Sequence, residues 1–134
     1  LKLFYKDESF DIRRKIIDYN TKNDDILKEF VNDPSEEIRK SIAYSIKDKD
    51  ALRILSKDPE YSVRREVLYN DNTDKDALIE LYKSTDFSAF EKDSIYYKLR
   101  NMGVDVEKLS SQANLFNKIN VFYKLASSNY YTSI

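Results

Sequence analysis

Three pairs of side chains in this sequence have the chemistry of a ligand-binding surface. Each pair places a basic residue four positions before a tyrosine: Lys15 with Tyr19, Lys40 with Tyr44, and Arg65 with Tyr69. On a helix, residues four apart lie on the same face. An exposed tyrosine offers a large contact area at low entropic cost, and a neighbouring cation steers and holds a negatively charged ligand. The pairs therefore predict a surface that binds a protein or peptide partner, acidic or phosphorylated where it meets the bases.

Residue types that support most catalytic mechanisms are missing from the sequence. It contains no His and no Cys, so the commonest general base and the thiolate nucleophile and metal ligand are excluded. Neighbouring carboxylates such as Asp24 and Asp25 project about 100° apart on a helix and do not form a converging acid and base pair. There is no glycine-rich phosphate loop. We therefore expect no catalytic residues, no metal site, no cofactor and no enzymatic activity from this chain.

The charge balance limits the choice of partner. The formal net charge is −1 and the sequence pI is about 5.6, so the chain lacks the broad basic field that holds nucleic acid or anionic lipid. Asp18, Glu66, Asp71 and Asp93 also interrupt the helices that would carry the basic stripe. Nucleic acid is thus a less favoured partner than protein. No apolar run reaches the roughly 20 residues of a membrane span, so we expect no membrane contact and a soluble, cytoplasmic protein.

An internal repeat organises the elements that position these side chains. Residues 33–45 return as 58–70 with an offset of 25, and residues 14–20 align with 39–45 at the same offset. With one Gly and two Pro, the sequence has few of the residues that tight turns and hairpins need. Repetition at this period in a sequence of this composition predicts an all-α fold of stacked helix pairs.

Each repeat is expected to contain a first and a second helix. The predicted first helices are 1–6, 23–32, 48–57 and 74–84, and the predicted second helices are 9–20, 35–46, 60–70 and 88–101. Asn23, Asp48 and Asp74 stand at the N-cap position of three first helices. The aspartates at the starts of these helices are therefore expected to be capping residues and not metal ligands.

The helical wheel separates a packed face from an exposed face in the second helices. With Ile38 at zero, Ile42 falls at about 40° and Ile46 at about 80°, whereas Lys40 and Tyr44 fall near 200° and 240°. The first three should be buried and the last two exposed. A structural interpretation of the pairs stays open, because solenoid faces also carry regular columns of side chains that pack against the neighbouring repeat.

The repeat pattern ends in the C-terminal part of the chain. The fourth copy is degenerate, and Gly103, the sole glycine, predicts a helix C-cap. A longer apolar periodicity then predicts a helix over 104–128 that caps the open face of the last repeat, followed by a tail of residues 129–134 that is frayed or docked. We expect one structural domain, with the repeat stack over 1–103. Since the sequence starts at Leu1, inside the first helix of a repeat, we also expect it to be a fragment or a processed product.

The pattern of Asp, often with Pro after it, then Ile or Val and Arg, an apolar pair and a Leu-x-x-Leu helix resembles HEAT repeats over residues 7–101. The phrase from Val67 to Leu81 is most similar to the leucine-rich repeat variant type. The resemblance implies a right-handed α-solenoid of three to four short helix pairs. It also implies a structural ladder between neighbouring repeats, which assigns Asp33 with Arg39, Asp58 with Arg64, and Asp7 with Arg13 or Arg14.

Taken together, these features favour a non-enzymatic helical-repeat scaffold that binds a protein or peptide along a column formed by the three basic–tyrosine pairs. A nucleic-acid-binding HEAT-like domain is the first alternative, because some HEAT-like DNA glycosylases bind duplex on such a surface. A non-catalytic segment of a larger enzyme is the second. The sequence leaves open the partner, the biological process, the oligomeric state, the curvature of the stack and the exposure of the tyrosines.

Overall fold

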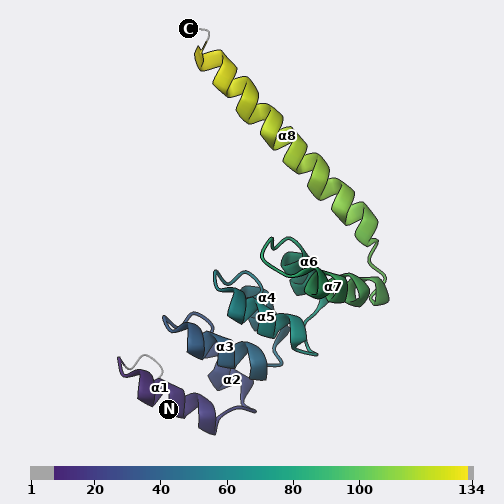
Figure 1. The fold of residues 1–134 in the computed structure, drawn as a ribbon. Coiled ribbons are helices and arrows are strands. Elements are labelled where there is room, and N and C mark those ends of the chain that lie inside the picture. The colour runs from purple at the N-terminus through teal and green to yellow at the C-terminus, as the bar shows by residue number, and fades with distance from the viewer. Residues whose placement is uncertain (1–7, 133–134) are drawn as a thin grey trace. The chain divides into compact units, whose positions relative to one another are not determined.

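The computed structural model of the chain describes residues 8–132 (Figure 1). The described residues form helices and no strands, which confirms the all-α prediction. Their bounds are α1 Phe10–Tyr19, α2 Asp24–Leu27, the 3-10 helix η1 Lys28–Phe30, α3 Glu36–Ser45, α4 Lys49–Leu55, α5 Tyr61–Tyr69, α6 Lys75–Tyr82, α7 Ala89–Asn101 and α8 Val106–Thr132. The predicted helix over residues 1–6 lies outside the described range.

Side chains at the predicted N-cap positions begin two of the first helices. Asp48 accepts a hydrogen bond from the Ala51 N–H at 2.9 Å, and Asp74 accepts one from the Ala77 N–H at 3.0 Å. Asn23 stands at the N-cap of α2 without a side-chain capping bond. The sequence therefore located all three helix starts, and the aspartates satisfy N–H groups that the helix itself leaves unpaired.

The second helices of consecutive repeats pack against one another. α1, α3 and α5 lie side by side in chain order, and α3 contacts both of its neighbours (Figure 1). In the other set, α4 contacts α6. The layers are joined within the stack because α4 also contacts α3 and α5. Each short helix thus obtains from its neighbours the burial that it lacks alone.

The core consists of the side chains that the repeat pattern selects. Ile38, Ile42 and Ile46 are fully buried, as the helical wheel predicts. The same holds for the apolar pairs at three-residue spacing in the first helices: Leu27 with Phe30, Leu52 with Leu55, and Leu78 with Leu81. One apolar stripe per first helix is enough here, since α4 and α6 pack against each other and against α5.

The chain divides into two compact units. Within the described range, the first unit comprises residues 8–98 and the second comprises residues 99–132. In the second unit, Gly103 has a φ of +81° and follows α7, and the Val104 N–H donates to the Leu99 carbonyl at 3.1 Å. This is the predicted C-cap. Helix α8 continues to Thr132, beyond the predicted end at 128, so residues 129–132 of the predicted tail are helical.

Helix α8 carries apolar side chains that are exposed, among them Leu115, Ile119 and Phe122. Its predicted role as a cap over the last repeat stays a prediction. Within residues 8–132, no helix combines the length and the apolar character needed to cross a lipid bilayer.

Candidate functional site

A ladder of buried ion pairs joins successive repeats. The Arg13 Nε donates to Asp33 Oδ2 at 2.8 Å and its Nη2 to Asp33 Oδ1 at 3.2 Å. The Arg39 guanidinium holds Asp58 with the same two atoms at the same distances. Each carboxylate also accepts a backbone N–H two residues on, from Ser35 in one rung and from Glu60 in the next. Fork-like pairing of this kind fixes both partners in one geometry.

The partners within this ladder differ from the predicted ones. Asp33 was assigned to Arg39, but its carboxylate binds Arg13 of the preceding repeat, and Arg39 binds Asp58 of the following repeat. The contact within a repeat is made to the backbone, since Arg39 Nη1 donates to the Asp33 carbonyl at 2.7 Å. An arginine carries enough donors for both tasks. Asp7, the remaining predicted member, lies outside the described residues.

The third rung has a different geometry. Arg64 Nη1 donates to the Asp58 carbonyl at 2.6 Å, as in the rung before, and its Nη2 contacts the Asp86 carboxylate. The predicted pair of Asp58 with Arg64 is therefore again a contact to the backbone carbonyl and not to the carboxylate. The Asp86 side chain is 49% exposed, compared with 5% for Asp58.

The ladder also corrects the alignment of the first repeat. Arg13 occupies the position of Arg39, so the offset between these two helices is 26 and not 25. Arg14 is then the counterpart of Lys40, and Asp18 is the counterpart of Tyr44. The predicted pair of Lys15 and Tyr19 consequently falls one residue out of register with the other two pairs.

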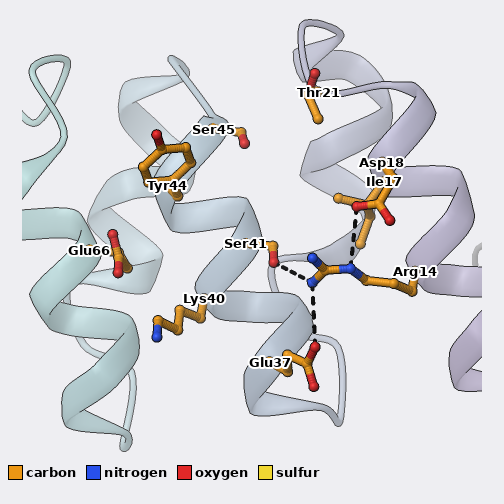
Figure 2. A pocket seen from close by; sticks show the side chains of 10 residues that line it. All are labelled: Arg14, Ile17, Asp18, Thr21, Glu37, Lys40, Ser41, Tyr44, Ser45 and Glu66. Atoms are coloured by element: carbon orange, nitrogen blue, oxygen red, sulfur yellow. Dashed lines mark hydrogen bonds and ion pairs between the residues drawn. The ribbon is translucent and has the colours of Figure 1, made fainter.

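A surface cavity of about 500 Å³ lies on the second helices of the first three repeats (Figure 2). It is lined by ten residues: Arg14, Ile17, Asp18, Thr21, Glu37, Lys40, Ser41, Tyr44, Ser45 and Glu66. Helices α1 and α3 contribute most of this lining, and α5 contributes Glu66. Of the six residues in the predicted column, Lys40 and Tyr44 line the cavity, whereas Lys15 and Tyr19 are exposed elsewhere on α1.

One side of the cavity is held by Arg14. Its Nη1 donates to the Ser41 hydroxyl at 2.6 Å and lies 3.7 Å from Glu37 Oε1, and its Nε lies 3.3 Å from Asp18 Oδ1 (Figure 2). Arg14 of α1 thus links this helix to Ser41 and Glu37 of α3. Its charge is shared between two carboxylates, so this arginine is a structural link more than a free cation.

The other side of the cavity carries polar groups without protein partners in the described part of the chain. Lys40 forms no ion pair within residues 8–132, and neither does Glu66. Tyr44 is 75% exposed, which agrees with the exposure that the helical wheel predicts for it. Lys40 and Glu66 project from α3 and α5 toward the space between these helices (Figure 2). A ligand in this cavity can therefore contact the Lys40 ammonium, the Glu66 carboxylate and the Tyr44 hydroxyl.

The third predicted pair serves the structure of the repeat. The Arg65 guanidinium lies over the Tyr69 ring at 5.1 Å from its centroid, and its Nε donates to Glu91 Oε1 at 3.2 Å. Lys98 covers the same ring at 6.0 Å and donates to the Leu68 carbonyl at 2.6 Å. Burial lowers the pKa of Lys98 from its ordinary value. Arg65 and Tyr69 thus already contact other groups of the protein, whereas Lys40 and Tyr44 have no such partners in the described residues.

Glu91 is a buried carboxylate that the sequence did not single out. It replaces the isoleucine or valine of the earlier repeats, and it forms a capping box with Ser88 at the start of α7, where the Ser88 N–H donates to Oε2 at 2.9 Å. Tyr61 and Arg65 donate to Oε1 at 2.5 and 3.2 Å. Burial acts to raise the pKa of Glu91, but these hydrogen bonds outweigh it and the pKa is lowered. The spacing Ser88-x-x-Glu91 could have revealed the capping box.

Within residues 8–132, no group of three or more Asp or Glu side chains lies together in a way that could hold a metal ion. Comparison of the chain with protein-family models, with curated proteins and with solved structures found no match.

Proposed function

We propose that this chain is a short right-handed α-solenoid of the HEAT-like type that acts as a non-enzymatic scaffold and binds an extended peptide segment in the cavity on α1, α3 and α5. The ladder supports the solenoid, since its first two rungs tie an arginine of one repeat to an aspartate of the next with the same bidentate geometry. The packing of α3 against both α1 and α5 supports the same arrangement.

The observation that carries the binding proposal is that Lys40 and Glu66, which line a cavity of about 500 Å³, form no ion pair within residues 8–132. This volume lies in the range of ligand-binding clefts, roughly 300–1,000 Å³. Opposite charges on facing helices suit a segment that carries both an acidic and a basic side chain. Tyr44 adds a flat contact surface between them, as binding sites for peptides commonly do.

Nucleic acid is a poorer fit to this cavity. Three carboxylates line it, from Asp18, Glu37 and Glu66, against two basic side chains, one of which is shared between Asp18 and Glu37. A phosphate backbone needs several unopposed cations for its affinity. A purely acidic partner is disfavoured for the same reason, so the predicted acidic ligand becomes a segment of mixed charge.

The experiment is a selection of binding segments from a random-peptide display, followed by affinity measurements with purified variants. Lys40→Ala should lower the affinity for the selected peptide by about tenfold, because one charged hydrogen bond is lost. Lys15→Ala is the matched control: it removes an exposed lysine from a helix of the same layer, outside the cavity. Equal loss of affinity in both variants, or in neither, contradicts the proposed site.

A further inference from the structure

The one buried side-chain donor without a hydrogen-bond acceptor in the described part of the chain is the Nε of Arg64. In the two preceding rungs this atom donates to an aspartate at 2.8 Å. Here the carboxylate of Asp86 takes Nη2 instead. Asp86 lies 22 positions after Arg64, whereas Asp58 lies 19 positions after Arg39, so the third rung closes over a longer stretch of chain.

Arg64 also lines a second cavity, of about 270 Å³, at the turn between α6 and α7 and the end of α4. Its lining residues are Ser56, Lys57, Asp58, Arg64, Glu80, Lys83 and Ser84. The two acids in this set are already neutralised, because Asp58 is held by Arg39 and Glu80 lies 3.3 Å from the Lys83 ammonium. Lys57 is exposed and forms no ion pair within the described residues.

An N–H group that is buried without an acceptor destabilises the fold relative to a bonded one. Arg64 is 8% exposed and its Nε is buried, so solvent does not relieve that cost. An oxygen of an anion seated in the cavity would supply the acceptor that the carboxylate supplies in the other rungs. The two terminal nitrogens of the guanidinium are already occupied, Nη1 by the Asp58 carbonyl and Nη2 by Asp86, so Nε is the donor that such an oxygen would complete.

We propose that the cavity bounded by Arg64, Lys57 and Lys83 binds a phosphate group, either free or carried by a phosphorylated peptide. Arg64 provides the directed N–H donor and Lys57 provides charge without fixed geometry, whereas Lys83 shares its charge with Glu80. The Ser84 hydroxyl lies in the same lining and can donate to a further oxygen. A tetrahedral dianion uses these several donors better than a carboxylate, which presents two oxygens in one plane.

The test is an NMR titration of the full chain labelled with ¹⁵N, in which the Nε–H resonances of Arg13, Arg39 and Arg64 are followed. Inorganic phosphate, acetate and chloride are added at matched ionic strength. Phosphate should shift the Arg64 resonance saturably and leave the Arg13 and Arg39 resonances in place, since their Nε atoms already have acceptors. A shift of equal size with chloride, or no saturable shift with phosphate, overturns the proposal.

Two variants sharpen this titration. Asp86→Asn removes a competing negative charge beside the guanidinium and should tighten phosphate binding, whereas Lys57→Gln should weaken it by about tenfold, which corresponds to about 1.4 kcal/mol. If Asp86→Asn leaves the affinity unchanged or lowers it, the anion does not sit at Arg64. A phosphoserine peptide that binds more tightly than inorganic phosphate identifies a peptide as the source, and equal affinity identifies free phosphate.

Discussion

At the scale of single residues, the arginines of the ladder explain how one side chain can define a repeat. Arg39 reaches the carbonyl of Asp33 within its own repeat and the carboxylate of Asp58 in the next. The carboxylate is 5% exposed, so it depends on this arginine for its charge balance. The hydrogen bond from Arg39 to Asp58 also raises the pKa of Arg39, which stays charged at every accessible pH.

Arg39→Ala is therefore expected to lower the free energy of unfolding by about 3 kcal/mol, because it leaves the Asp58 carboxylate buried without its cation. Chemical denaturation of the purified variant measures this. Arg53→Ala is the control, since Arg53 pairs with Asp74 and Asp50 at the exposed surface and should cost about 1 kcal/mol or less. Equal losses in the two variants would show that the ladder adds nothing beyond ordinary surface pairing.

Glu91 gives the fold a dependence on acid pH. Its pKa lies below the ordinary value of 4.5 in the folded chain, so the unfolded chain binds its proton first as the pH falls. The stability from this group is complete above that ordinary value and is lost as the pH drops through the lower, folded one. Glu91→Gln should thus destabilise the chain at about pH 7 and progressively less toward about pH 3.

Unfolding of wild type and Glu91→Gln by denaturant across this pH range measures the difference between them. Asp105→Asn is a useful control, since Asp105 is exposed and its carboxylate accepts the Lys108 N–H at the start of α8. A difference between wild type and Glu91→Gln that grows as the pH falls would mean that Glu91 is protonated more easily in the folded chain, contrary to its bonding.

At the scale of elements, helix starts were more predictable than side-chain register. A capping residue bonds to the backbone within the three residues that follow it. Asp48 and Asp74 therefore predict the starts of α4 and α6 from the local sequence alone. The register of α1 depends on which arginine meets Asp33, a contact 20 residues away. Arg13 and Arg14 are both arginine, and the sequence alone gives no preference between them. Because of this ambiguity, the predicted column includes Lys15 and Tyr19 in place of Arg14 and Asp18, the true counterparts of Lys40 and Tyr44.

The caps also yield a matched comparison within one layer of helices. Asp48→Ala should lower the free energy of unfolding by about 1 kcal/mol, because the Ala51 N–H loses its acceptor. Asn23→Ala should cost less, since Asn23 occupies the same position without a side-chain bond. Thermal unfolding of the two variants side by side measures the difference, and a larger loss for Asn23→Ala would contradict the assigned caps.

At the scale of the whole molecule, the repeat made the packed face predictable and left the binding face to be located. Burial of Ile38 and Ile42 follows from the periodicity, which Val63 and Val67 repeat in the next copy. The cavity depends instead on which charged groups find partners across neighbouring helices. Arg65 finds Glu91, a residue of the degenerate fourth copy, while Lys40 finds none in the described residues. Pairs that look equivalent in sequence are thus unequal in the folded chain.

The tyrosines provide the most direct measurement on the proposed peptide scaffold. Tyr44 is 75% exposed on the cavity and Tyr19 is 87% exposed outside it, so both can be replaced with little effect on the core. The affinity of a display-selected peptide should fall by about tenfold or more in Tyr44→Ala and stay unchanged in Tyr19→Ala. Unchanged affinity in Tyr44→Ala, or a comparable loss in Tyr19→Ala, would contradict a binding site on α1, α3 and α5.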